Sequence, residues 1–492
     1  MSLSLLLEMA VSSHGERIAL SDGEQQLTYA ELAEWVARAG AVVRQHGAAN
    51  LVFVGRNGIA FPQLMLAAAA GGAAFAPLNY RLSVTGLHDQ LDSLPAALVV
   101  CDADYLPAAR GYPAISTAEF MARVRQTPAA PAAEVDAGSA AVVLFTSGTT
   151  SRPKAVLLRH ENLLAYIVST VELGAAEPAD TALVTVPPYH IAAVGSALSN
   201  LYAGRRVVYL PDFDPQRWLA LVREQAVTTA MVVPTMLARI IEVLAGTPAD
   251  TPDLRLISYG GARMPLPVLL RAMEAFSDTG FCNAYGLTET SSTIALLGPD
   301  DHRQALASLD PTVRGRLASV GRPVPGIEVQ LRDQDGAPVT AGGTGELWVR
   351  GPQVSGSYAG QGSVLDEQGW FPTRDLARVD EHGFLYIEGR ADDTIIRGGE
   401  NIHPAEIEDV LVGHPAIKEA AVVGVSDEDW GQRIVAVLVA RTATSPPDDD
   451  VRAYVRQQLR GARTPDQIVW RAELPHTPTG KVLRRQIVAE LC

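Results

Sequence analysis

Short β-branched runs alternate with helix-like segments between residues 97 and 276 of this 492-residue chain. Strands that alternate with helices are typical of βαβ units, which build parallel sheets covered by helices on both faces. The sequence therefore predicts an α/β fold. We expect strands at Ala97–Cys101, Ala140–Thr146, Ala182–Val186, Arg206–Leu210, Thr229–Val233 and Leu254–Tyr259, and helices at Phe213–Glu224, Thr235–Ala245 and Pro265–Phe276.

The pattern changes after about residue 320, where Gly and Pro become frequent and short strands are expected at Glu346–Arg350 and Phe384–Glu388. The last hundred or so residues combine expected strands and helices into a separate α+β unit. We therefore expect a large N-terminal domain of parallel-rich sheets and a β-rich subdomain over residues 1–390, and a small C-terminal domain over residues 391–492.

Charge and apolar runs exclude several classes of protein. The chain has 40 Lys and Arg against 55 Asp and Glu, a net charge of −15, which argues against a protein that binds the phosphate backbone of nucleic acid over a broad surface. The most apolar run, Leu64–Leu78, is shorter than the ~20 residues of a membrane span, so we expect a tightly packed helix that leads into a strand and no membrane segment. Cys101, Cys282 and Cys492 lie far apart, which indicates a reducing compartment, the cytoplasm.

The strongest motif, Phe145–Ala155, directly follows an expected buried strand. Its small hydroxyl residues and its glycine let backbone N–H groups face an anion closely, and a lysine adds positive charge, so we expect the loop to cradle phosphate. It is not the G-x-x-x-x-G-K-[ST] loop of the common NTPases. The simpler interpretation is a Ser/Thr-rich surface loop. The residues of the expected phosphate loop are Thr146, Ser147, Gly148, Thr149, Thr150 and Lys154.

A second motif, Asn283–Thr290, places an aromatic ring, a glycine, a hydroxyl and a carboxylate within a few residues. Tyr285 could stack on a nucleobase, and Gly286 allows close approach. Thr288 could donate to a phosphate, and Glu289 could bind Mg²⁺ through oxygen. The alternative is a strand-to-helix turn that Thr288 caps.

Weaker candidates lie elsewhere in the chain. Gly260 and Gly261 follow an expected strand, where α/β sheets leave room for a ligand, although a plain βα turn has the same pattern. Asp375 could accept both hydroxyls of a ribose with Arg390 beside it, and the alternative is an ordinary surface ion pair. Lys481 follows a Gly turn near the C-terminus, where a solvated tail is the default expectation.

The order of these motifs resembles that of one family. TSGTTSRPK, PPYH, YGLTE, TRD, GRADD and PTGK follow one another as in the AMP-forming adenylating superfamily, which contains acyl- and aryl-CoA synthetases, nonribosomal adenylation domains and firefly luciferases. The resemblance extends from about residue 28 to residue 490. Residues 389–432 are most similar to the 4-chlorobenzoate- and benzoate-type CoA ligases.

The resemblance implies an ATP site and a mobile C-terminal domain. Lys481 would bridge the substrate carboxylate and the α-phosphate, Glu289 would bind Mg²⁺, and Asp392 would be the hinge of the small domain. The implied nucleotide contacts are Thr146 to Lys154 for the β- and γ-phosphates; Gly260, Gly261, Ala262, Asn283 and Tyr285 for adenine, with Gly286 allowing close approach; Thr288 for the α-phosphate; and Asp375 and Arg390 for the ribose.

The resemblance also implies sites for the acid and for coenzyme A. His190 would lie at the mouth of the acid pocket, whose expected wall is His190, Ile191, Val194, Gly261 and Ser291. Because this wall carries no charged side chain, we expect a neutral, bulky aromatic or alicyclic acid. Gly398 and Gly399 would line the pantetheine tunnel, and Trp430 would contact the CoA adenine.

The expected activity is therefore that of an AMP-forming acyl-CoA synthetase, which converts an acid and ATP to acyl-AMP and pyrophosphate and then forms a thioester with CoA. The stretch Gly461–Gln467 departs from the Lys/Arg-rich pattern of many relatives, because Arg463 is retained but Asp466 is acidic. A carrier-protein thiol is therefore an alternative acceptor. A non-catalytic adenylate-binding module is an alternative of another class, and a homodimer remains one option for the assembly.

Other enzyme classes find no support in the sequence. A hydrolase is not indicated, because neither a G-x-S-x-G elbow nor an H-E-x-x-H pair is present. His160 and His414 are expected to be ordinary histidines at the surface of helices or loops.

Overall fold

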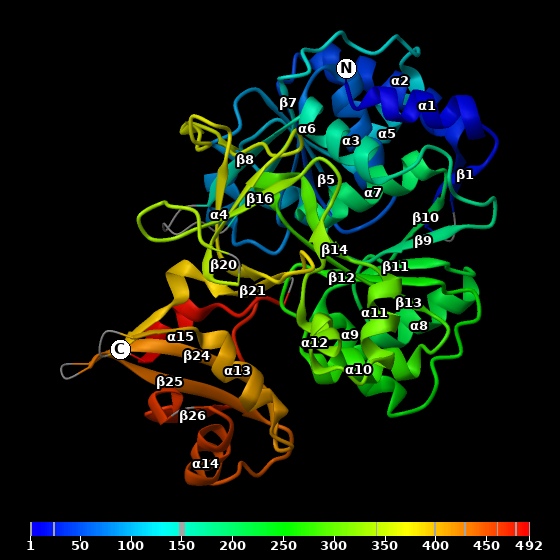
Figure 1. The fold of residues 1–492 in the computed structure, drawn as a ribbon. Helices are drawn as coiled ribbons and strands as arrows, with labels where there is room; N and C mark the ends of the chain where they lie inside the picture. The colour runs from blue at the N-terminus through cyan, green and yellow to red at the C-terminus, as the bar shows by residue number, and fades with distance from the viewer. Residues whose placement is uncertain are drawn as a thin grey trace.

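The structure, a computed structural model, describes residues 2–22, 25–146, 153–340, 342–397, 400–427, 430–459, 461–477 and 480–491. A large lobe contains the N-terminal part of the chain, and a smaller lobe, orange to red in Figure 1, contains the C-terminal part. The large lobe consists of parallel-rich sheets with helices and a β-rich subdomain, so the predicted fold class is confirmed.

One large sheet holds the strand that leads into the expected phosphate loop. Its core strands β3, β4, β5, β6 and β7 run parallel, and β8 closes a hairpin with β7. The strand order is β19 (Gly362–Ser363), β18 (Ser357–Tyr358), β8 (Lys154–Arg159), β7 (Ala140–Thr146), β4 (Ala74–Pro77), β3 (Asn50–Val54), β5 (Ala97–Cys101) and β6 (Ala114–Ser116).

A second large sheet ends at the segment that carries Tyr285 and Glu289. Strands β10, β9, β11, β12 and β13 run parallel, and β14 returns antiparallel to β13. The order is β15 (Arg322–Pro323), β14 (Ser292–Leu297), β13 (Gly280–Leu287), β12 (Leu256–Gly260), β11 (Thr229–Val232), β9 (Thr181–Val184), β10 (Arg206–Tyr209), β1 (Ile18–Ser21) and β2 (Gln26–Thr28).

The remaining sheets are mainly antiparallel. The β-rich subdomain has the order β16 (Glu328–Arg332), β17 (Thr344–Arg350), β20 (Phe371–Val379) and β21 (Leu385–Arg390). The small lobe begins with the hairpin β22 (Ile395–Arg397) and β23 (Glu400–Ile402). It continues with the sheet β24 (Ile417–Asp427), β25 (Gly431–Ala440) and β26 (Gln467–Arg471), in which β26 is parallel to β25.

Helices cover the large sheets and both faces of the small-lobe sheet (Figure 1). A capping box of Thr28 and Glu31 opens α2, where Glu31 N donates to Thr28 Oγ1 at 3.1 Å. The helices are α1 (Ser4–His14), α2 (Tyr29–His46), α3 (Ala60–Gly71), α4 (Val84–Leu91), α5 (Thr117–Gln126), α6 (His160–Thr170), α7 (Ile191–Ala203), α8 (Pro215–Glu224), α9 (Pro234–Leu244), α10 (Leu266–Ala275), α11 (Pro299–Ala307), α12 (Pro311–Gly315), α13 (Pro404–Gly413), α14 (Asp448–Gln458) and α15 (Arg484–Leu491).

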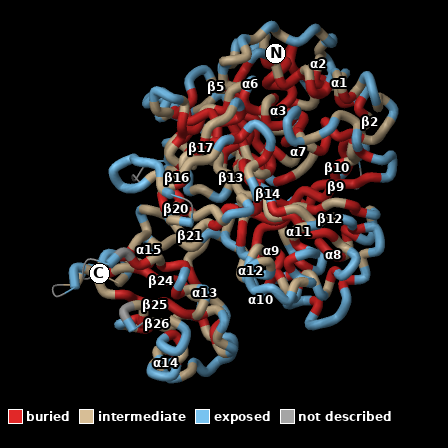
Figure 2. The backbone as a smooth tube through the Cα atoms, in the orientation of Figure 1, coloured by how far each residue is buried: buried red, intermediate tan, exposed pale blue. Residues whose placement is uncertain are grey.

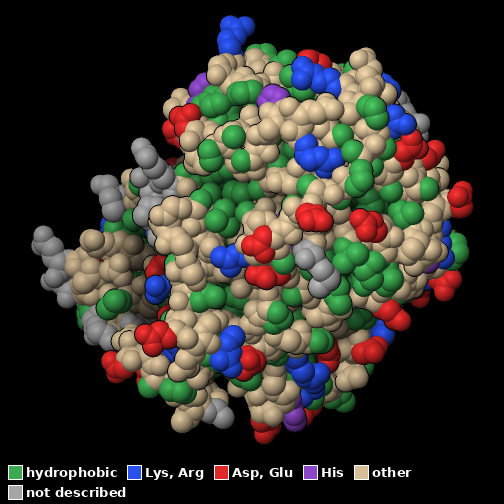
Figure 3. Space-filling model, turned by 90° about the horizontal axis from the view of Figure 1, so that it is seen from above, with side chains coloured by type: hydrophobic (Ala, Val, Ile, Leu, Met, Phe, Trp, Pro, Cys, Tyr) green, Lys and Arg blue, Asp and Glu red, His purple; other side chains and the backbone are tan. Residues whose placement is uncertain are grey.

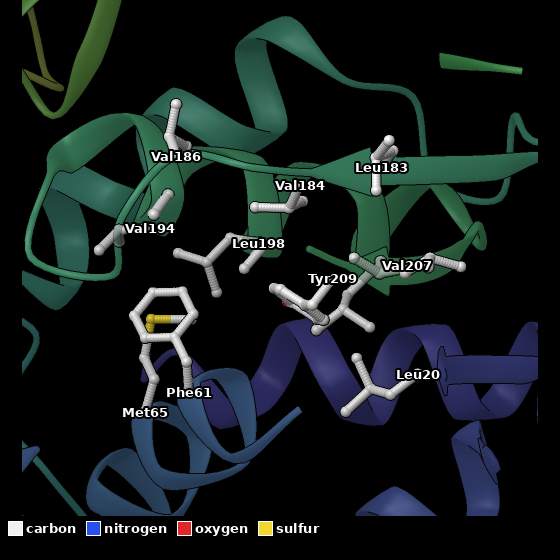
Figure 4. Packing of buried hydrophobic residues seen from close by; sticks show 14 of the residues in the cluster. Leu20, Phe61, Met65, Leu183, Val184, Val186, Val194, Leu198, Val207 and Tyr209 are labelled. Carbon is white, nitrogen blue, oxygen red and sulfur yellow. The ribbon is translucent and has the colours of Figure 1, made fainter. Parts of the chain in front are cut away.

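The main hydrophobic core lies between the helices and sheets of the large lobe, where Figure 2 shows most of the buried backbone. In Figure 4, Phe61 and Met65 of α3 point toward Val194 and Leu198 of α7. The apolar run predicted as a packed helix leading into a strand forms α3 and β4, and its members Leu64 to Ala70 are almost fully buried. No helix in the described ranges is long and apolar enough to cross a membrane.

The surface mixes charges of both signs. In Figure 3, Lys and Arg side chains lie between Asp and Glu side chains on the face shown. One prediction about individual residues is wrong: His160 is 1% exposed at the start of α6, and Leu3 N donates to its Nδ1 at 3.1 Å. The α1 helix, which packs on this part of the large lobe, covers the histidine.

Candidate functional site

Tyr285, Asp375 and Arg390 form a buried polar group where β13 meets the β-rich subdomain. Tyr285 Oη donates to Asp375 Oδ2 at 2.5 Å, and Arg390 Nη1 donates to Asp375 Oδ1 at 2.9 Å. Asp375 and Arg390 face one another in the β20–β21 register, and Asp375 is 6% exposed. Burial and then the charge of Asp375 raise the pKa of Tyr285 well above its usual value, so its hydroxyl stays a donor. The aspartate is thus a buried acceptor with two donors, which is more than a surface ion pair.

Lys481 of the C-terminal lobe lies beside this group. Lys481 is exposed, and neighbouring atoms of the protein exclude some of the water around its ammonium. Loss of water, and then the charge of Arg390, lower the pKa of Lys481, while Asp375 and Asp393 work in the opposite direction. The charges of Arg390 and Asp375 therefore act on Lys481, although Lys481 is 91 residues or more from both in sequence.

The turn that carries Lys481 docks on helix α9 of the large lobe. Lys481 N donates to Thr477 Oγ1 at 3.0 Å, and Gly480 N donates to Thr477 O at 2.8 Å. Gly480 has φ +78°, and a Cβ built on it would collide with Thr235 of α9. Only glycine therefore fits this turn against α9 without a shift.

Ion pairs also join the lobes. Arg263, which follows Gly260, Gly261 and Ala262, forms an ion pair with Asp409 of α13. Lys418 Nζ lies 3.7 Å from Glu242 Oε1. These four side chains are each about half exposed, so the pairs fix an orientation more than they stabilise it.

A second polar group joins Glu289 to Lys154. Tyr358 Oη donates to Glu289 Oε1 at 2.9 Å, and Lys154 Nζ lies 5.2 Å from the centroid of the Tyr358 ring. Lys154 pairs with Thr146 across the β7–β8 hairpin. Since Glu289 follows Tyr285 by four residues, this group adjoins the one around Asp375. Ser147, Gly148, Thr149 and Thr150 lie outside the described residues.

The segment around Thr288 is a tight turn. Thr288 and Glu289 lie in a short 3-10 helix between β13 and β14, and Ser291, with φ +56°, ends it. Gly286 lies so close to the next strand that a Cβ built on it would collide with Ser292 O. The turn therefore fixes where Thr288 and Glu289 stand.

His190 caps the start of α7 next to Tyr189. Their ring centroids are 4.6 Å apart, and His190 Nε2 is buried with no hydrogen-bond partner among the described residues. Burial and then the charge of Arg81 lower the pKa of His190 to about 4, so the ring is neutral at pH 7. Ile191 is partly buried beside it, whereas Val194 is fully buried in the main core.

The wall behind Glu289 is formed by α7 and β14. A Cβ on Gly195 would lie 3.0 Å from Ser292 Oγ, so the helix and the strand are already in close contact. Ser291 is fully buried, and its Oγ has no hydrogen-bond partner in the part of the chain that the structure describes.

The end of β12 leaves open space. Gly261 is exposed with φ +80°, and a Cβ built on it would meet Val233 alone, at 3.8 Å. Asn283 Nδ2 donates to Ser319 O at 3.1 Å in the neighbouring strand β13. Gly260 and Ala262 flank this space.

The remaining predicted residues belong to the hinge and to the proposed CoA site. Asp392 is exposed in a single 3-10 turn directly after β21. Trp430 is 54% exposed in the β24–β25 turn, with the Arg397 guanidinium 5.0 Å above its ring. Gly398 and Gly399 lie outside the described residues.

Sequence reasoning missed Tyr358, Arg263 and Thr235. Tyr358 contacts Glu289 from 69 residues away. Its Ser-Tyr-Ala-Gly context has no spacing that indicates chemistry. The pattern of Gly and Pro around residues 351–360 could have indicated a tight segment, but not its partner.

Comparisons with known proteins agree with this geometry. The family model for AMP-binding enzyme matches residues 7–359, and that for the AMP-binding enzyme C-terminal domain matches residues 406–481. A feruloyl-CoA synthase of Amycolatopsis sp is 32% identical, over 95% of this chain and 95% of that protein. A 2-succinylbenzoate–CoA ligase of Geobacillus kaustophilus is 34% identical, over 96% and 94%.

A solved structure shows the same likeness. The o-succinylbenzoate CoA synthetase of Bacillus subtilis, in complex with its acyl-adenylate intermediate, matches with a TM-score of 0.84 and 28% identity, over 98% of this chain and 97% of that one. The family resemblance inferred from the motifs is thereby confirmed: the chain belongs to the AMP-binding enzyme family.

Proposed function

We propose that the protein joins a carboxylic acid to AMP, with release of pyrophosphate, and then transfers the acyl group to coenzyme A. The observation that carries the proposal is that the turn of Lys481 docks on helix α9 of the large lobe, and that the charges of Arg390 and Asp375 act on Lys481 although it comes from the other lobe. An enzyme that brings two anions together needs such a cation at their meeting point. The likeness to two CoA ligases supports the same activity.

The residues present fit ATP. Asp375 is a buried acceptor suited to the ribose hydroxyls, and Arg390 Nη1 donates to its Oδ1. The space over Gly261 suits a flat base beside Tyr285. Lys154 and Thr146 stand at the end of the β7–β8 hairpin, where the phosphates would lie. We assign the adenine to Gly260, Gly261, Ala262, Asn283, Tyr285 and Gly286.

The residues also fit Mg²⁺ held largely by phosphate oxygens. No cluster of three or more His, Cys, Asp or Glu that could hold a metal occurs in the described ranges. Glu289 offers one carboxylate, and Mg²⁺ is commonly bound by one or two carboxylates, substrate phosphates and water. When bound, Mg²⁺ would offset part of the negative charge of the phosphates.

Adenylation needs positioning more than acid–base chemistry. The substrate carboxylate is already an anion at pH 7, so its oxygen attacks the α-phosphorus and the bond to pyrophosphate breaks, with no proton to remove. Lys481 would sit between the carboxylate and the α-phosphate, and Thr288 would donate to that phosphate. Rotation of the small lobe near Asp392 would then withdraw Lys481 and admit the thiol.

The acid is expected to be neutral and aromatic or alicyclic. The proposed wall of His190, Ile191, Val194, Gly261 and Ser291 includes no charged side chain at pH 7, because His190 is neutral. A second charge on the acid would be buried without a partner, which is costly. The feruloyl and 2-succinylbenzoate groups named for the relatives contain aromatic rings, which supports an aromatic acid; 2-succinylbenzoate has a second carboxylate, so it does not support a neutral one.

A thiol acceptor other than free CoA is a second candidate, and a specific observation favours it. Arg463 Nε lies 2.7 Å from Glu406 Oε2, and Arg397 Nη2 lies 2.7 Å from Asp466 Oδ1. The guanidinium groups that would meet the phosphates of CoA are thus neutralised by acids. For CoA itself, Trp430 and the segment of Gly398 and Gly399 remain the proposed contacts.

The test separates the two half-reactions. Pyrophosphate release is measured over a panel of carboxylic acids, and the best acid is then offered CoA or an acyl carrier protein. Lys481→Ala is expected to lower pyrophosphate release by about 100- to 1,000-fold, since one preorganised donor to a developing charge contributes about 3–4 kcal/mol. Capture of supplied acyl-AMP by the thiol should stay within about twofold of wild type.

The control is Arg441→Ala, which removes an exposed cation of the same lobe that belongs to neither ion pair between the lobes. It should leave pyrophosphate release near the wild-type rate. Equal loss of both half-reactions in Lys481→Ala would contradict the role of Lys481. ADP or phosphate as the product would contradict the proposed reaction.

A further inference from the structure

A short segment, residues 353–359, ties the turn of Glu289 to the strand that begins with Lys154. Ser355 N donates to Glu289 O at 2.9 Å on one side. Ala359 N donates to Ala155 O at 2.9 Å on the other, and Ser355 Oγ donates to Leu157 O. The backbone therefore holds this segment between the two proposed ligand-binding elements.

Tyr358 lies at the centre of the segment and is 9% exposed. Its hydroxyl donates to Glu289 Oε1 at 2.9 Å, while its ring faces the Lys154 ammonium at 5.2 Å. A cation within about 6 Å of a ring centroid is attracted by the ring. The Tyr358 side chain thus contacts both Glu289, which we assign to Mg²⁺, and Lys154, which we assign to the phosphates of ATP.

These two contacts differ from those of an ordinary packed tyrosine. The hydroxyl occupies Oε1 of Glu289 and turns the carboxylate, which leaves Oε2 for a metal ion. Mg²⁺ requires near-ideal octahedral geometry, so the angle of its carboxylate ligand matters. The ring restrains Lys154 without neutralising it, whereas a carboxylate partner would cancel the charge that a phosphate needs.

We propose that Tyr358 is a positioning residue that aligns Glu289 for Mg²⁺ through its hydroxyl and holds Lys154 toward the phosphates through its ring. The proposal rests on the proposed function, because it takes Glu289 and Lys154 as metal and phosphate ligands. Its two parts are separable, since Tyr358→Phe removes the hydroxyl alone and Tyr358→Leu removes the ring as well.

The experiment measures binding without turnover. ATP is titrated into each protein by calorimetry, with no carboxylic acid present, once with Mn²⁺ as a spectroscopic substitute for Mg²⁺ and once with EDTA. The Mn²⁺ signal in electron paramagnetic resonance gives bound metal directly. Tyr358→Phe should weaken metal-dependent ATP binding by about 10- to 150-fold, the effect of one hydrogen bond to a charged group, and leave binding in EDTA unchanged. Tyr358→Leu should weaken both.

The chain offers a matched control in Tyr386. Its hydroxyl donates to Asp380 Oδ2 at 3.2 Å, and the Arg378 guanidinium lies 3.8 Å from its ring centroid, so it makes the same two kinds of contact elsewhere in the β-rich subdomain. Tyr386→Phe should bind ATP as the wild type does, with and without metal.

The outcomes distinguish the two proposals. Wild-type protein that shows no ATP binding under either condition would refute the proposed function. If the wild-type protein binds ATP and Tyr358→Phe shows the same metal dependence of ATP binding, the alignment of Glu289 by Tyr358 would be refuted, but the proposed function would not. Equal weakening by Tyr358→Phe with Mn²⁺ and with EDTA would show a merely structural role, and would also overturn the proposal. Thermal melting of each variant identifies any protein that has not folded.

Discussion

Replacing Asp375 with asparagine removes one charge from a buried group and keeps its shape. In the wild type, the carboxylate accepts from Tyr285 at 2.5 Å and from Arg390 at 2.9 Å. Asparagine can turn its oxygen to Arg390 and its NH₂ to Tyr285, whose hydroxyl rotates to accept. The hydrogen bonds of the protein are then satisfied, and the change isolates the lost charge.

The magnitude follows from these contacts. Hydrogen bonds to a charged acceptor are worth about 1.5–3 kcal/mol, and those between neutral groups about 0.5–1.5 kcal/mol. Two ribose hydroxyls that donate to a neutral amide in place of a carboxylate should therefore lose about 2 kcal/mol together, or about 30-fold in the dissociation constant of ATP. The substitution also removes the negative charge paired with Arg390. Because Arg390 is 31% exposed, this loss should lower the free energy of unfolding by a smaller amount, about 1 kcal/mol.

The assay is calorimetric titration of ATP in the absence of acid, with the free energy of unfolding measured in urea. Asp380→Asn is the matched control, because Asp380 also accepts from a tyrosine, at 3.2 Å, but outside the proposed site. It should bind ATP as the wild type does. If Asp375→Asn bound ATP within twofold of wild type while its stability fell, the aspartate would be a structural partner of Arg390, and its assignment to the ribose would be wrong.

Two further predictions concern the lobes and the core. Arg263→Ala removes the ion pair with Asp409, and an exposed pair contributes up to about 1 kcal/mol. Pyrophosphate release should therefore fall by up to about fivefold, while capture of supplied acyl-AMP is kept. Equal losses in both steps would contradict a role of the ion pair in lobe orientation. Burial lowers the pKa of His160 to about 4, so this histidine is neutral in the folded protein but protonated in the unfolded chain below pH 6.5. Because the unfolded chain then binds more protons, stability falls as the pH drops from 6.5 to 4. Between pH 8 and pH 5, urea unfolding of the wild type should lose about 2 kcal/mol more than that of His160→Gln, and parallel losses would contradict this account.

Local patterns in the sequence predicted the elements well, because their physical causes are local. The strands Ala97–Cys101 and Ala140–Thr146 have the predicted bounds, and the capping box at Thr28 opens the predicted helix. The alternation of strands and helices gave the class of fold, and the order of the motifs gave the family, which the comparisons confirm.

Contacts between distant segments were outside the reach of these patterns. Nothing in the spacing of Tyr358 indicates Glu289, and nothing around Arg263 indicates Asp409, 146 residues later. His160 was wrongly expected at the surface for the same reason, since it contacts Leu3, which lies 157 residues earlier in the sequence. Such pairs are set by how the sheets and lobes meet, which depends on the whole chain.

Helix α7 has a consequence for any attempt to change the acid. Val194 points into the cluster with Phe61 and Met65, so enlarging or trimming it alters the packing that holds α3 and α7 together (Figure 4). A Val-to-Ala change there removes about two methylene equivalents from a close-packed interior, at a cost of roughly 1–3 kcal/mol. Ile191 lies one turn earlier and is partly exposed, so a substitution there should disturb this packing less than one at Val194. Redesign of substrate preference should therefore start at the open end of α7, where selectivity and thermostability can be varied independently.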